Sequence, residues 1–361
     1  MANEFSQDHL LIYGARLAGR RVRDYLTARG QSVDAFLDRD ESLKEVDGLP
    51  VYSAQRWAAS RDPSTACVLI GVFNAHVDTR VIFDDLEALG YARIVSMVEF
   101  VRLYPEDQPF RYWLVEPRFY ERHASRISAL RDALDDETSK QLLDAIVEYR
   151  TQGDPRSLPP VAEHQYFPSD LPRLPEPLRF IDCGAYTGDT VQAMREAGLE
   201  FEAIATFEPN LQNYQILVDN LGQERASHFP CGVSDSNRQS CFDPALGAGG
   251  HLVAGGGDPV FCVRLSDALP GFAPNLIKMD IEGEEPAALR GGEAMLRRYR
   301  PNLAISVYHQ AEHLWSIFEH LQELDLGYHF HLRCHAYSTF DTVLYAIATR
   351  EAAGQPRANQ A

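Results

Sequence analysis

The segment from Phe180 to Thr190, which reads F-I-D-C-G-A-Y-T-G-D-T, constrains the fold more than any other part of the chain. An apolar run leads into Asp182, the glycines Gly184 and Gly188 follow, and a helical pattern then begins. This order predicts a strand, a tight turn and the N-terminus of a helix. Because glycine has no side chain, such a turn also leaves room for a ligand against the backbone.

An acid follows the next expected strand. The apolar run 203–207 ends at Glu208, which lies 24 residues after Gly184 (208 − 184 = 24). A carboxylate at the end of the second strand is placed to accept hydrogen bonds from a ribose diol. The sequence therefore predicts a site for a nucleoside-bearing cofactor, and the alternative is a glycine turn that binds no ligand.

The acid in the turn distinguishes between cofactors. A dinucleotide enzyme uses G-x-G-x-x-G, because the pyrophosphate lies on the helix N-terminus. Here the turn has two glycines, and Asp182 precedes the first of them. A carboxylate repels phosphate and attracts a cation. S-adenosylmethionine carries an ammonium and a sulfonium and no phosphate, so we expect this cofactor, with Asp182 near its amino-acid end and Glu208 at its ribose.

Composition restricts the partners. The chain has 361 residues and a net charge of −18, with 45% hydrophobic and 24% charged residues. This length allows two domains of about 150 residues each. We find no Lys/Arg cluster of the kind that nucleic acids or anionic membranes require, so we expect neither as a partner. A small-molecule or saccharide acceptor is expected instead, and a homodimer is left open.

The expected location is the cytoplasm. The N-terminus lacks the basic and apolar regions of a secretory signal, and no apolar run approaches the ~18 residues that span a bilayer. The six cysteines are scattered, without a C-x-x-C pair, which is typical of free thiols in a reducing compartment.

Four segments are predicted along the chain. Strand and helix patterns alternate over residues 1–104, which indicates a small Rossmann-like domain. Residues 105–178 carry two helical patterns and a proline-rich passage, and we interpret them as a connector and linker. Residues 179–350 form the domain that begins with the glycine turn, and residues 351–361 are predicted to be a disordered tail.

The third segment has the pattern of a doubly wound α/β sheet. Strands are expected at 228–233, 276–280 and 303–308, with helices at 211–221 and 286–299 between strands. The glycine-rich stretch 236–258 is expected to be a mobile loop or hairpin insertion that shapes the acceptor pocket. The last two strands, 328–332 and 342–348, have no helix between them and should pair as an antiparallel hairpin.

Several motifs together resemble those of a known family. They are the glycine turn, F-E-P-N at 207–210, I-K-M-D-I-E-G-E-E at 277–285, P-N-L-A-I-S-V-Y-H at 301–309 and T-V-L-Y-A at 342–346. In combination they resemble the FkbM family of S-adenosylmethionine-dependent methyltransferases. The resemblance implies the class I methyltransferase sheet of seven strands and O-methylation of sugars, polysaccharides or polyketide natural products. Cys183 replaces the valine or isoleucine frequent in the family, a change that is conservative in volume.

Candidate catalytic residues end the fourth and fifth strands. We expect His309 to be the base that removes the acceptor's hydroxyl proton and Asp280 to orient the acceptor or cofactor. Alternatively, His309 is satisfied by a neighbour, and Asp280 and Glu282 cap the next helix. Asp280, Glu282, His309 and His313 could supply ligands for a divalent ion, but no tight ligand spacing supports it, and no metal is predicted.

The residues expected to contact the cofactor lie in the turn, at the start of the following helix and at the ends of later strands. They are Asp182, Gly184, Ala185, Tyr186, Gly188, Asp189, Thr190, Glu208, Asn210, Ser234 and Asp280.

The N-terminal turn is a weaker version of the dinucleotide pattern. It reads G-A-R-L-A-G at 14–19, with Arg16 in place of the middle glycine, and Asp38 lies 24 residues after Gly14 (38 − 14 = 24). With I-G-V-F-N at 70–74, it resembles the small Rossmann-like domain that precedes some sugar-modifying enzymes and can bind a nucleotide-sugar there. The alternative is a degenerate domain that serves dimerisation or positioning.

The leading hypothesis is therefore a methyltransferase that acts on a hydroxyl of a saccharide or glycosylated metabolite. A nucleotide-sugar-binding or redox protein with a degenerate second half is the alternative, and Asp182, Gly184, Gly188 and Glu208 argue against that degeneration. A non-catalytic carbohydrate-assembly partner is a third hypothesis.

Overall fold

A computed structural model of the chain describes residues 7–106, 110, 112–116, 118–222, 225–243, 250–253 and 256–348. The chain divides into two compact units. The N-terminal unit comprises residues 1–126, 141–161 and 334–341, and the C-terminal unit comprises residues 127–140, 162–333 and 342–361. The residues expected to form a connector, 105–178, are thus distributed over both units. The expected tail, 351–361, lies outside the described residues.

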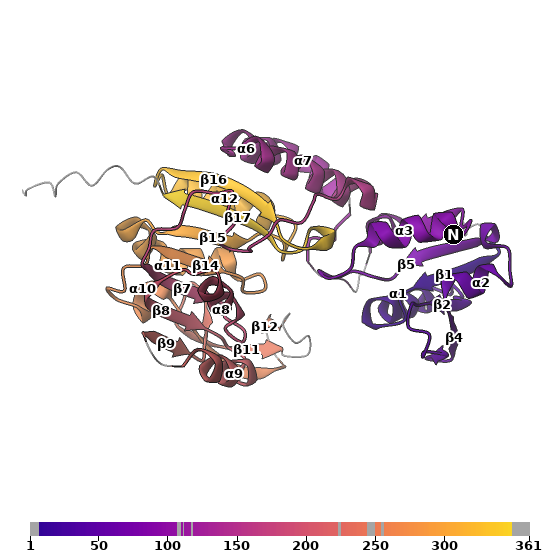
Figure 1. Cartoon of the computed structure of the whole chain (residues 1–361), viewed down its shortest axis with the longest axis horizontal. Coiled ribbons are helices and arrows are strands. Elements are labelled where there is room, and N and C mark those ends of the chain that lie inside the picture. Colours follow the sequence, from indigo (N-terminus) through magenta and orange to yellow (C-terminus); the bar gives the residue numbers. More distant parts are fainter. Residues whose placement is uncertain are drawn as a thin grey trace, which may run out of the picture. The chain divides into compact units, whose positions relative to one another are not determined.

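The N-terminal unit contains a six-stranded sheet in the order β3-β4-β2-β1-β5-β6 (Figure 1). Every pairing is parallel except that of β3 with β4, which form a hairpin. The strands are β1 His9–Tyr13, β2 Ala35–Leu37, β3 Glu45–Val46, β4 Leu49–Tyr52, β5 Ala66–Ile70 and β6 Arg93–Val95. The alternation expected from the sequence is present, and the β3–β4 hairpin is an addition to it.

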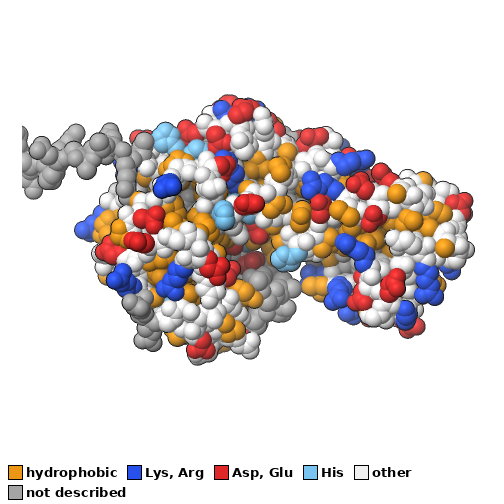
Figure 2. All heavy atoms as spheres, in the orientation of Figure 1, with side chains coloured by type: hydrophobic (Ala, Val, Ile, Leu, Met, Phe, Trp, Pro, Cys, Tyr) orange, Lys and Arg blue, Asp and Glu red, His pale blue; other side chains and the backbone are white. Residues whose placement is uncertain are grey.

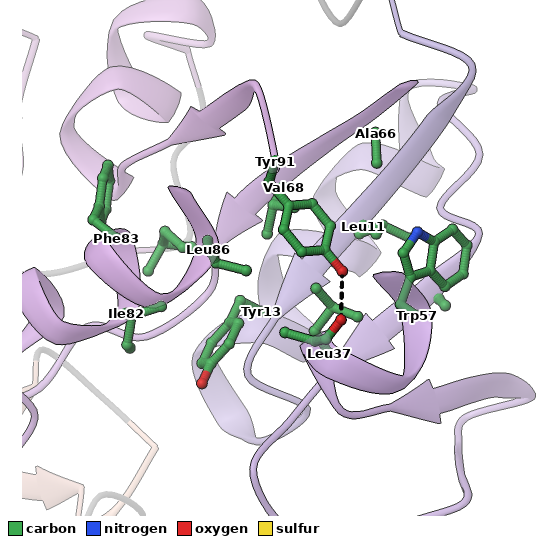
Figure 3. Packing of buried hydrophobic residues seen from close by; sticks show 13 residues of the cluster. Leu11, Tyr13, Leu37, Trp57, Ala66, Val68, Ile82, Phe83, Leu86 and Tyr91 are labelled. Carbon is green, nitrogen blue, oxygen red and sulfur yellow. Dashed lines mark hydrogen bonds between the residues drawn. The ribbon is translucent and has the colours of Figure 1, made fainter. Parts of the chain in front are cut away.

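Helices connect these strands, and an apolar core fills the space between them. The helices are α1 Leu17–Ala28, α2 Ala54–Ala58, α3 Thr79–Ala88 and α4 Met97–Leu103. Figure 3 shows Leu11, Val68 and Trp57 in this core, where the hydroxyl of Tyr91 donates a 2.9 Å hydrogen bond to the carbonyl oxygen of Ala54. The core explains why β1 and β5 are apolar along almost their whole length, as strands buried on both faces must be.

Three further helices follow the sheet of the N-terminal unit in sequence: α5 Arg118–Arg122, α6 Ala124–Ala133 and α7 Glu137–Gln152. Within the N-terminal unit, the fully buried Arg150 of α7 lies over the ring of Trp113 at 4.8 Å, and its Nε donates to Thr339 Oγ1 at 3.0 Å. The proline-rich passage that follows is not wholly exposed, because Pro155, Leu158 and Tyr166 are buried.

The C-terminal unit is built on a seven-stranded sheet in the order β16-β17-β15-β14-β7-β8-β9 (Figure 1). The strands β15, β14, β7, β8 and β9 are parallel, and β17 is antiparallel to β15. The strands are β7 Leu178–Cys183, β8 Phe201–Phe207, β9 Ala226–Phe229, β14 Leu276–Met279, β15 Asn302–Ser306, β16 Tyr328–Cys334 and β17 Thr342–Ala348. The predicted fold class and the adjacent last two strands are confirmed.

Helices α8 Asp189–Glu196, α9 Leu211–Leu221, α11 Glu285–Tyr299 and α12 His313–Glu323 join these strands. Val191 and Met194 of α8 and Leu217 of α9 pack with Phe180 of β7 in one buried cluster, so α8 and α9 share a face of the sheet. Helix α9 begins after Asn210, whose side chain accepts hydrogen bonds from the N–H groups of Gln212 and Asn213.

A second, four-stranded sheet lies in the stretch expected to be a loop or hairpin insertion. Its order is β10-β13-β11-β12, with β10 Gly232–Val233, β11 Arg238–Asp243, β12 His251–Val253 and β13 Asp258–Val263, and α10 Leu265–Ala268 follows. The pairings of β11 with β12 and β13 are antiparallel, as in the hairpin alternative. The glycines Gly247, Gly249 and Gly255, which suggested a mobile loop, lie outside the described residues.

Acidic and basic side chains are interspersed on the face seen in Figure 2. Among the helices of the described residues, none has both the length and the apolar character needed to cross a membrane.

Candidate active site

The candidate site lies where the order of strands reverses. Strands β7 and β14 are neighbours in the sheet, whereas the chain proceeds from β7 outward through β8 and β9 before it returns to β14. Ligands of open α/β sheets bind beyond the carboxyl ends of the strands at such a switch point. Gly184, Glu208 and Asp280 each follow the end of one of these strands, so the structure brings these predicted residues to one edge of the sheet.

The turn after β7 requires its glycines. Gly184 has a φ of +79°, and a Cβ there would lie 1.9 Å from the carbonyl oxygen of Asp280. Gly188 has a φ of +86°, and a Cβ there would lie 2.8 Å from Leu221 Cγ. Glycine is thus needed both for the left-handed backbone and for the close approach to the end of β14.

Glu208 is tied to this turn. Its carboxylate accepts a 2.9 Å hydrogen bond from the N–H of Tyr186 in the turn and another from the N–H of Asn210 at 2.9 Å. Burial raises the pKa of Glu208 to about 7, although these N–H groups lower it. A carboxylate has about four acceptor positions, so lone pairs remain for a ribose diol.

Asp182 is buried near the end of β7, just before the turn. Its side chain is fully buried and forms an ion pair with Lys278 of β14, with 3.0 Å between Oδ1 and Nζ. Burial alone would lower the pKa of the Lys278 ammonium, but the Asp182 carboxylate raises it above its ordinary value. The carboxylate thus pairs with a protein cation, and its place near the amino-acid end of the cofactor stays a prediction.

Asp280 is the most accessible acid at the ends of the central strands. Its side chain is 22% exposed. The hydroxyl of Tyr166 donates to Oδ2 at 2.7 Å, and the hydroxyl of Tyr308 donates to Oδ1 at 3.4 Å. These contacts fix the carboxylate at the end of β14 while part of it stays open to a ligand.

His309 lies among carboxylates beyond β15. Its Nδ1 is 2.9 Å from Glu285 Oε1, and its Nε2 is 3.3 Å from Asp280 Oδ1 and 3.7 Å from Glu282 Oε1. Glu285 is fully buried at the first position of α11, where it also accepts a 2.8 Å hydrogen bond from the N–H of Ile281. This geometry orients the ring and directs Nε2 toward Asp280, as a carboxylate orients histidine in hydrolases.

The opposite charges in this cluster stabilise each other's ionised forms. Burial alone would lower the pKa of His309, but Glu285 and Glu282 raise it well above its ordinary value. Burial alone would raise the pKa of Glu285, but His309 and His313 hold it well below the usual range. At neutral pH the pair is therefore an imidazolium and a carboxylate. The N-cap residue of α11 is Glu284, which makes no side-chain capping bond, so capping of this helix by Asp280 or Glu282 stays an alternative.

One grouping of ligand atoms has the size of a metal site. Atoms of Asp280, Glu285 and His309 lie within 4.8 Å of one another. It differs from the set weighed from the sequence, since Glu285 takes part. However, the imidazole and the Glu285 carboxylate already bond to each other, so a metal ion would have to displace the proton between them.

The remaining predicted residues have varied surroundings. In the turn, Ala185 is buried and Tyr186 is exposed; at the start of α8, Asp189 is exposed and Thr190 is buried. The side chain of Asn210 caps α9, as described above.

Ser234 is fully buried, and its hydroxyl donates to Glu284 Oε2 at 3.2 Å and accepts from Arg238 Nη2 at 3.3 Å. An open pocket of about 500 Å³ lies beside these residues and is lined by Arg238, Gln239, Ser240, Cys241, Leu252, Pro259 and Glu284.

Sequence reasoning missed three residues of this site: Lys278, Glu285 and Tyr166. A signal existed for Lys278, because a lysine inside the apolar run L-I-K-M is costly to bury without a partner. No local pattern pointed to Glu285, which meets His309 only through the packing of α11 against the end of β15. Tyr166 lies in the passage that was expected to be a linker.

A family model and one solved structure agree with this fold. A family model, described as the methyltransferase FkbM domain, matches residues 182–330. The crystal structure of methyltransferase FkbM from Methylobacillus flagellatus KT is 23% identical, with a TM-score of 0.79, and the match covers 96% of this chain and 92% of that one. The structure of precorrin-6y C5,15-methyltransferase from Geobacter metallireducens GS-15 is 17% identical, with a TM-score of 0.30, and covers 49% of this chain and 83% of that one. No curated protein matches.

Proposed function

Residues 182–330 belong to the methyltransferase FkbM domain family, and from this premise we propose that the chain transfers a methyl group from S-adenosylmethionine to a hydroxyl of a sugar, polysaccharide or natural-product acceptor. The family match supports the general assignment as an S-adenosylmethionine-dependent methyltransferase. The observation that carries the more specific proposal is the position of Asp280. This partly exposed carboxylate ends β14 beside the turn that would hold the cofactor, and it is hydrogen-bonded to Tyr166 and close to His309.

Three features fit the cofactor. The turn from Gly184 to Gly188 passes close to the backbone at Asp280, and Glu208 is held against the turn with lone pairs for a ribose. The acids Asp280 and Glu282 add negative charge at this edge, which suits the sulfonium and ammonium groups. When bound, S-adenosylmethionine would supply an electrophilic methyl group for the acceptor oxygen to attack, and S-adenosylhomocysteine would be the leaving group.

The chain's own residues then align the acceptor and take its proton. As the acceptor oxygen bonds to the methyl carbon and the carbon–sulfur bond breaks, the hydroxyl proton must leave. The sequence assigned this proton to His309. Because neighbouring carboxylates raise the pKa of His309 and its Nε2 lies 3.3 Å from Asp280 Oδ1, we propose Asp280 as the proton acceptor instead. The imidazolium then stabilises the Asp280 carboxylate in its reactive orientation.

The pocket beside β11 supports a hydroxyl-rich acceptor. Its lining offers both hydrogen-bond donors and hydrogen-bond acceptors, from Arg238, Gln239, Ser240 and Glu284. This is the acceptor region expected from the stretch 236–258. We propose the acceptor there because Glu284, in the loop that follows Asp280, lines the pocket.

The N-terminal unit is a second candidate site, for a nucleotide-sugar. Its turn places the N–H of Ala15 against the carboxylate of Asp38, with 2.8 Å between N and Oδ2. Arg16, at the start of α1, is largely exposed and pairs with Asp40. The alternative is a unit that only positions or dimerises the chain. Titration with a nucleotide-sugar distinguishes the two, because only the first proposal expects binding.

Transfer of labelled methyl groups tests the proposal. We expect the chain, supplied with methyl-labelled S-adenosylmethionine and a panel of nucleotide-sugars and oligosaccharides, to label a hydroxyl oxygen. His309→Ala should keep affinity for S-adenosylhomocysteine and lower turnover, whereas Asp280→Asn should weaken that affinity and lower turnover further. A product labelled on nitrogen or carbon would contradict O-methylation, and full turnover in Asp280→Asn would contradict its role.

The pH dependence of turnover separates the two assignments of the base. A rate that rises with alkaline pH and loses this rise in His309→Gln would favour His309. A rate that is flat across that range and lost in Asp280→Asn would favour Asp280.

No metal is predicted to take part. Dialysis of the chain against EDTA should leave both cofactor affinity and turnover unchanged. Restoration of lost turnover by Mg²⁺ or Mn²⁺ would contradict this and assign the Asp280, Glu285 and His309 grouping to an ion.

A further inference from the structure

A row of buried residues, several of them polar, crosses the middle of the C-terminal sheet. In register, Thr206 of β8 lies beside Asp182 of β7, Asp182 beside Lys278 of β14, Lys278 beside Ala304 of β15, and Ala304 beside Tyr345 of β17. All five are buried, with at most 3% of any residue exposed. On β7 and β14 the positions two residues earlier, Phe180 and Leu276, belong to the apolar core under α8 and α9. A charged pair in this place needs an explanation.

Stability alone does not explain it. An apolar pair of similar volume often serves as well as or better than a buried ion pair, because removing two charges from water is costly. The ammonium of Lys278 has a partner besides Asp182, however. It donates a 2.6 Å hydrogen bond to the carbonyl oxygen of Gly184, the first glycine of the cofactor turn.

The ammonium is also held from a third side. It lies 5.1 Å from the centre of the Tyr166 ring, which favours a cation over its face. The backbone N–H of Tyr166 donates to the hydroxyl of Tyr345 at 3.0 Å, and the Tyr166 hydroxyl donates to Asp280. Tyr166 thus contacts both the Lys278 ammonium and the Asp280 carboxylate.

We propose that Lys278 is a positioning residue of the cofactor turn: its ammonium fixes the carbonyl of Gly184, while Asp182 and Tyr166 fix the ammonium. Asp182 then serves the cofactor indirectly, through Lys278, and not by contact. This inference rests on the proposed function, because it assumes that the turn binds S-adenosylmethionine.

The experiment separates positioning from stability. S-adenosylhomocysteine is titrated calorimetrically into the unaltered chain, into Lys278→Met and into the double variant Asp182→Leu with Lys278→Met, and each is unfolded in urea. Lys278→Met should unfold at lower urea, because it leaves the Asp182 carboxylate buried without its cation. The double variant should recover the unfolding midpoint. Both should bind S-adenosylhomocysteine about tenfold more weakly or worse, since neither holds the Gly184 carbonyl.

A matched control lies at the start of β7, the strand that carries Asp182 near its end. Arg179 of β7 also binds a backbone carbonyl, that of Phe272, and pairs with Glu202 at 2.8 Å. Arg179→Met should lower the unfolding midpoint and leave affinity for S-adenosylhomocysteine unchanged.

Two results would overturn the inference while leaving the proposed function intact. These are unchanged affinity in Lys278→Met, and affinity that recovers together with stability in the double variant. If the unaltered chain fails to bind S-adenosylhomocysteine, the proposed function fails and the inference fails with it.

Discussion

In both units the first strand of the main sheet is followed by a glycine turn and a helix, and an acid at the end of the next strand accepts a hydrogen bond from the turn. In the N-terminal unit the N–H of Ala15 donates to Asp38 Oδ2 at 2.8 Å, and in the C-terminal unit the N–H of Tyr186 donates to Glu208 Oε2 at 2.9 Å. The difference lies in what surrounds the turn. Strands β1 and β5 carry no charged side chain between their ends, whereas β7 and β14 carry the Asp182–Lys278 pair.

The glycines also serve different contacts. In the N-terminal unit, a Cβ on Gly19 would lie 1.8 Å from the carbonyl oxygen of Gly14, and one on Gly71 would lie 2.6 Å from the Cα of Gly19. These glycines let α1 pack closely against the turn and the end of β5. In the C-terminal unit, Gly184 instead lets the turn lie against the backbone of Asp280. The same local pattern therefore serves packing in one unit and brings a turn to titratable groups in the other, so function must be argued from the site.

Alanine at Gly184 of the C-terminal turn and alanine at Gly19 of α1 should give the largest contrast. Gly184→Ala forces a side chain into a left-handed backbone and into contact with Asp280, so we expect S-adenosylhomocysteine binding to be lost. Gly19→Ala should destabilise the N-terminal unit and leave that binding unchanged. Calorimetric titration and urea unfolding of both variants check this. Binding by Gly184→Ala equal to that of the unaltered chain would break the comparison.

The next largest contrast is expected between Glu208 and Asp38, the acids that accept a hydrogen bond from each turn. Glu208→Ala should weaken S-adenosylhomocysteine affinity by about 10- to 100-fold, because hydrogen bonds to a charged group contribute about 1.5–3 kcal/mol. Asp38→Ala, the equivalent change in the other unit, should have no effect on the same titration. Equal effects of the two variants would show that the turns cannot be told apart by this ligand.

The affinity should also depend on pH through Glu208. Burial raises its pKa to about 7, so below this pH the group is increasingly protonated and loses acceptor capacity for the ribose. Titrations from pH 6 to pH 8, a range set about one unit either side of that pKa, should show affinity for S-adenosylhomocysteine rising. Glu208→Gln cannot ionise and should show no such rise. A rise that persists in Glu208→Gln would assign it to another group.

The smallest expected effect is the pH dependence of stability from His309 and Glu285. The raised pKa of His309 gives stability that is complete below about 6.5 and is lost as pH rises through its folded value. The lowered pKa of Glu285 gives stability that is present above about 4.5 and is lost as pH falls through its folded value. The difference in unfolding free energy between the unaltered chain and His309→Gln should therefore be larger near pH 6 than at alkaline pH.

Urea unfolding at both values measures this difference. Because the N-terminal unit has no such pair within its central strands, its own unfolding transition should not change with His309→Gln. A difference that grows with pH would contradict the assigned protonation of the pair.

The sequence predicted the elements whose signals are local. The bounds of α9 follow from the Asn210 cap and Gly222, and the adjacent β16 and β17 follow from the lack of a helix between them. The short β3 and β4 were missed, because strands of two and four residues carry too little periodicity.

The site was predictable only in part, for a related reason. Gly184, Glu208 and Asp280 lie at strand ends, so their meeting at one edge follows from the fold class alone. The roles of Asp182, Lys278 and Glu285 depend on which partner each side chain finds, and those partners come from other strands and helices. An acid beside a glycine turn attracts a cation, but the sequence could not show that this cation is Lys278 of the chain itself.

Calorimetric titration of the unaltered chain with S-adenosylhomocysteine, with NAD as the control ligand, tests the central claim most directly. The account predicts binding of S-adenosylhomocysteine that is lost in Gly184→Ala and retained in Gly19→Ala, together with no binding of NAD. Binding of NAD, or binding of S-adenosylhomocysteine that is lost in Gly19→Ala and retained in Gly184→Ala, would contradict the assignment of the cofactor to the C-terminal unit.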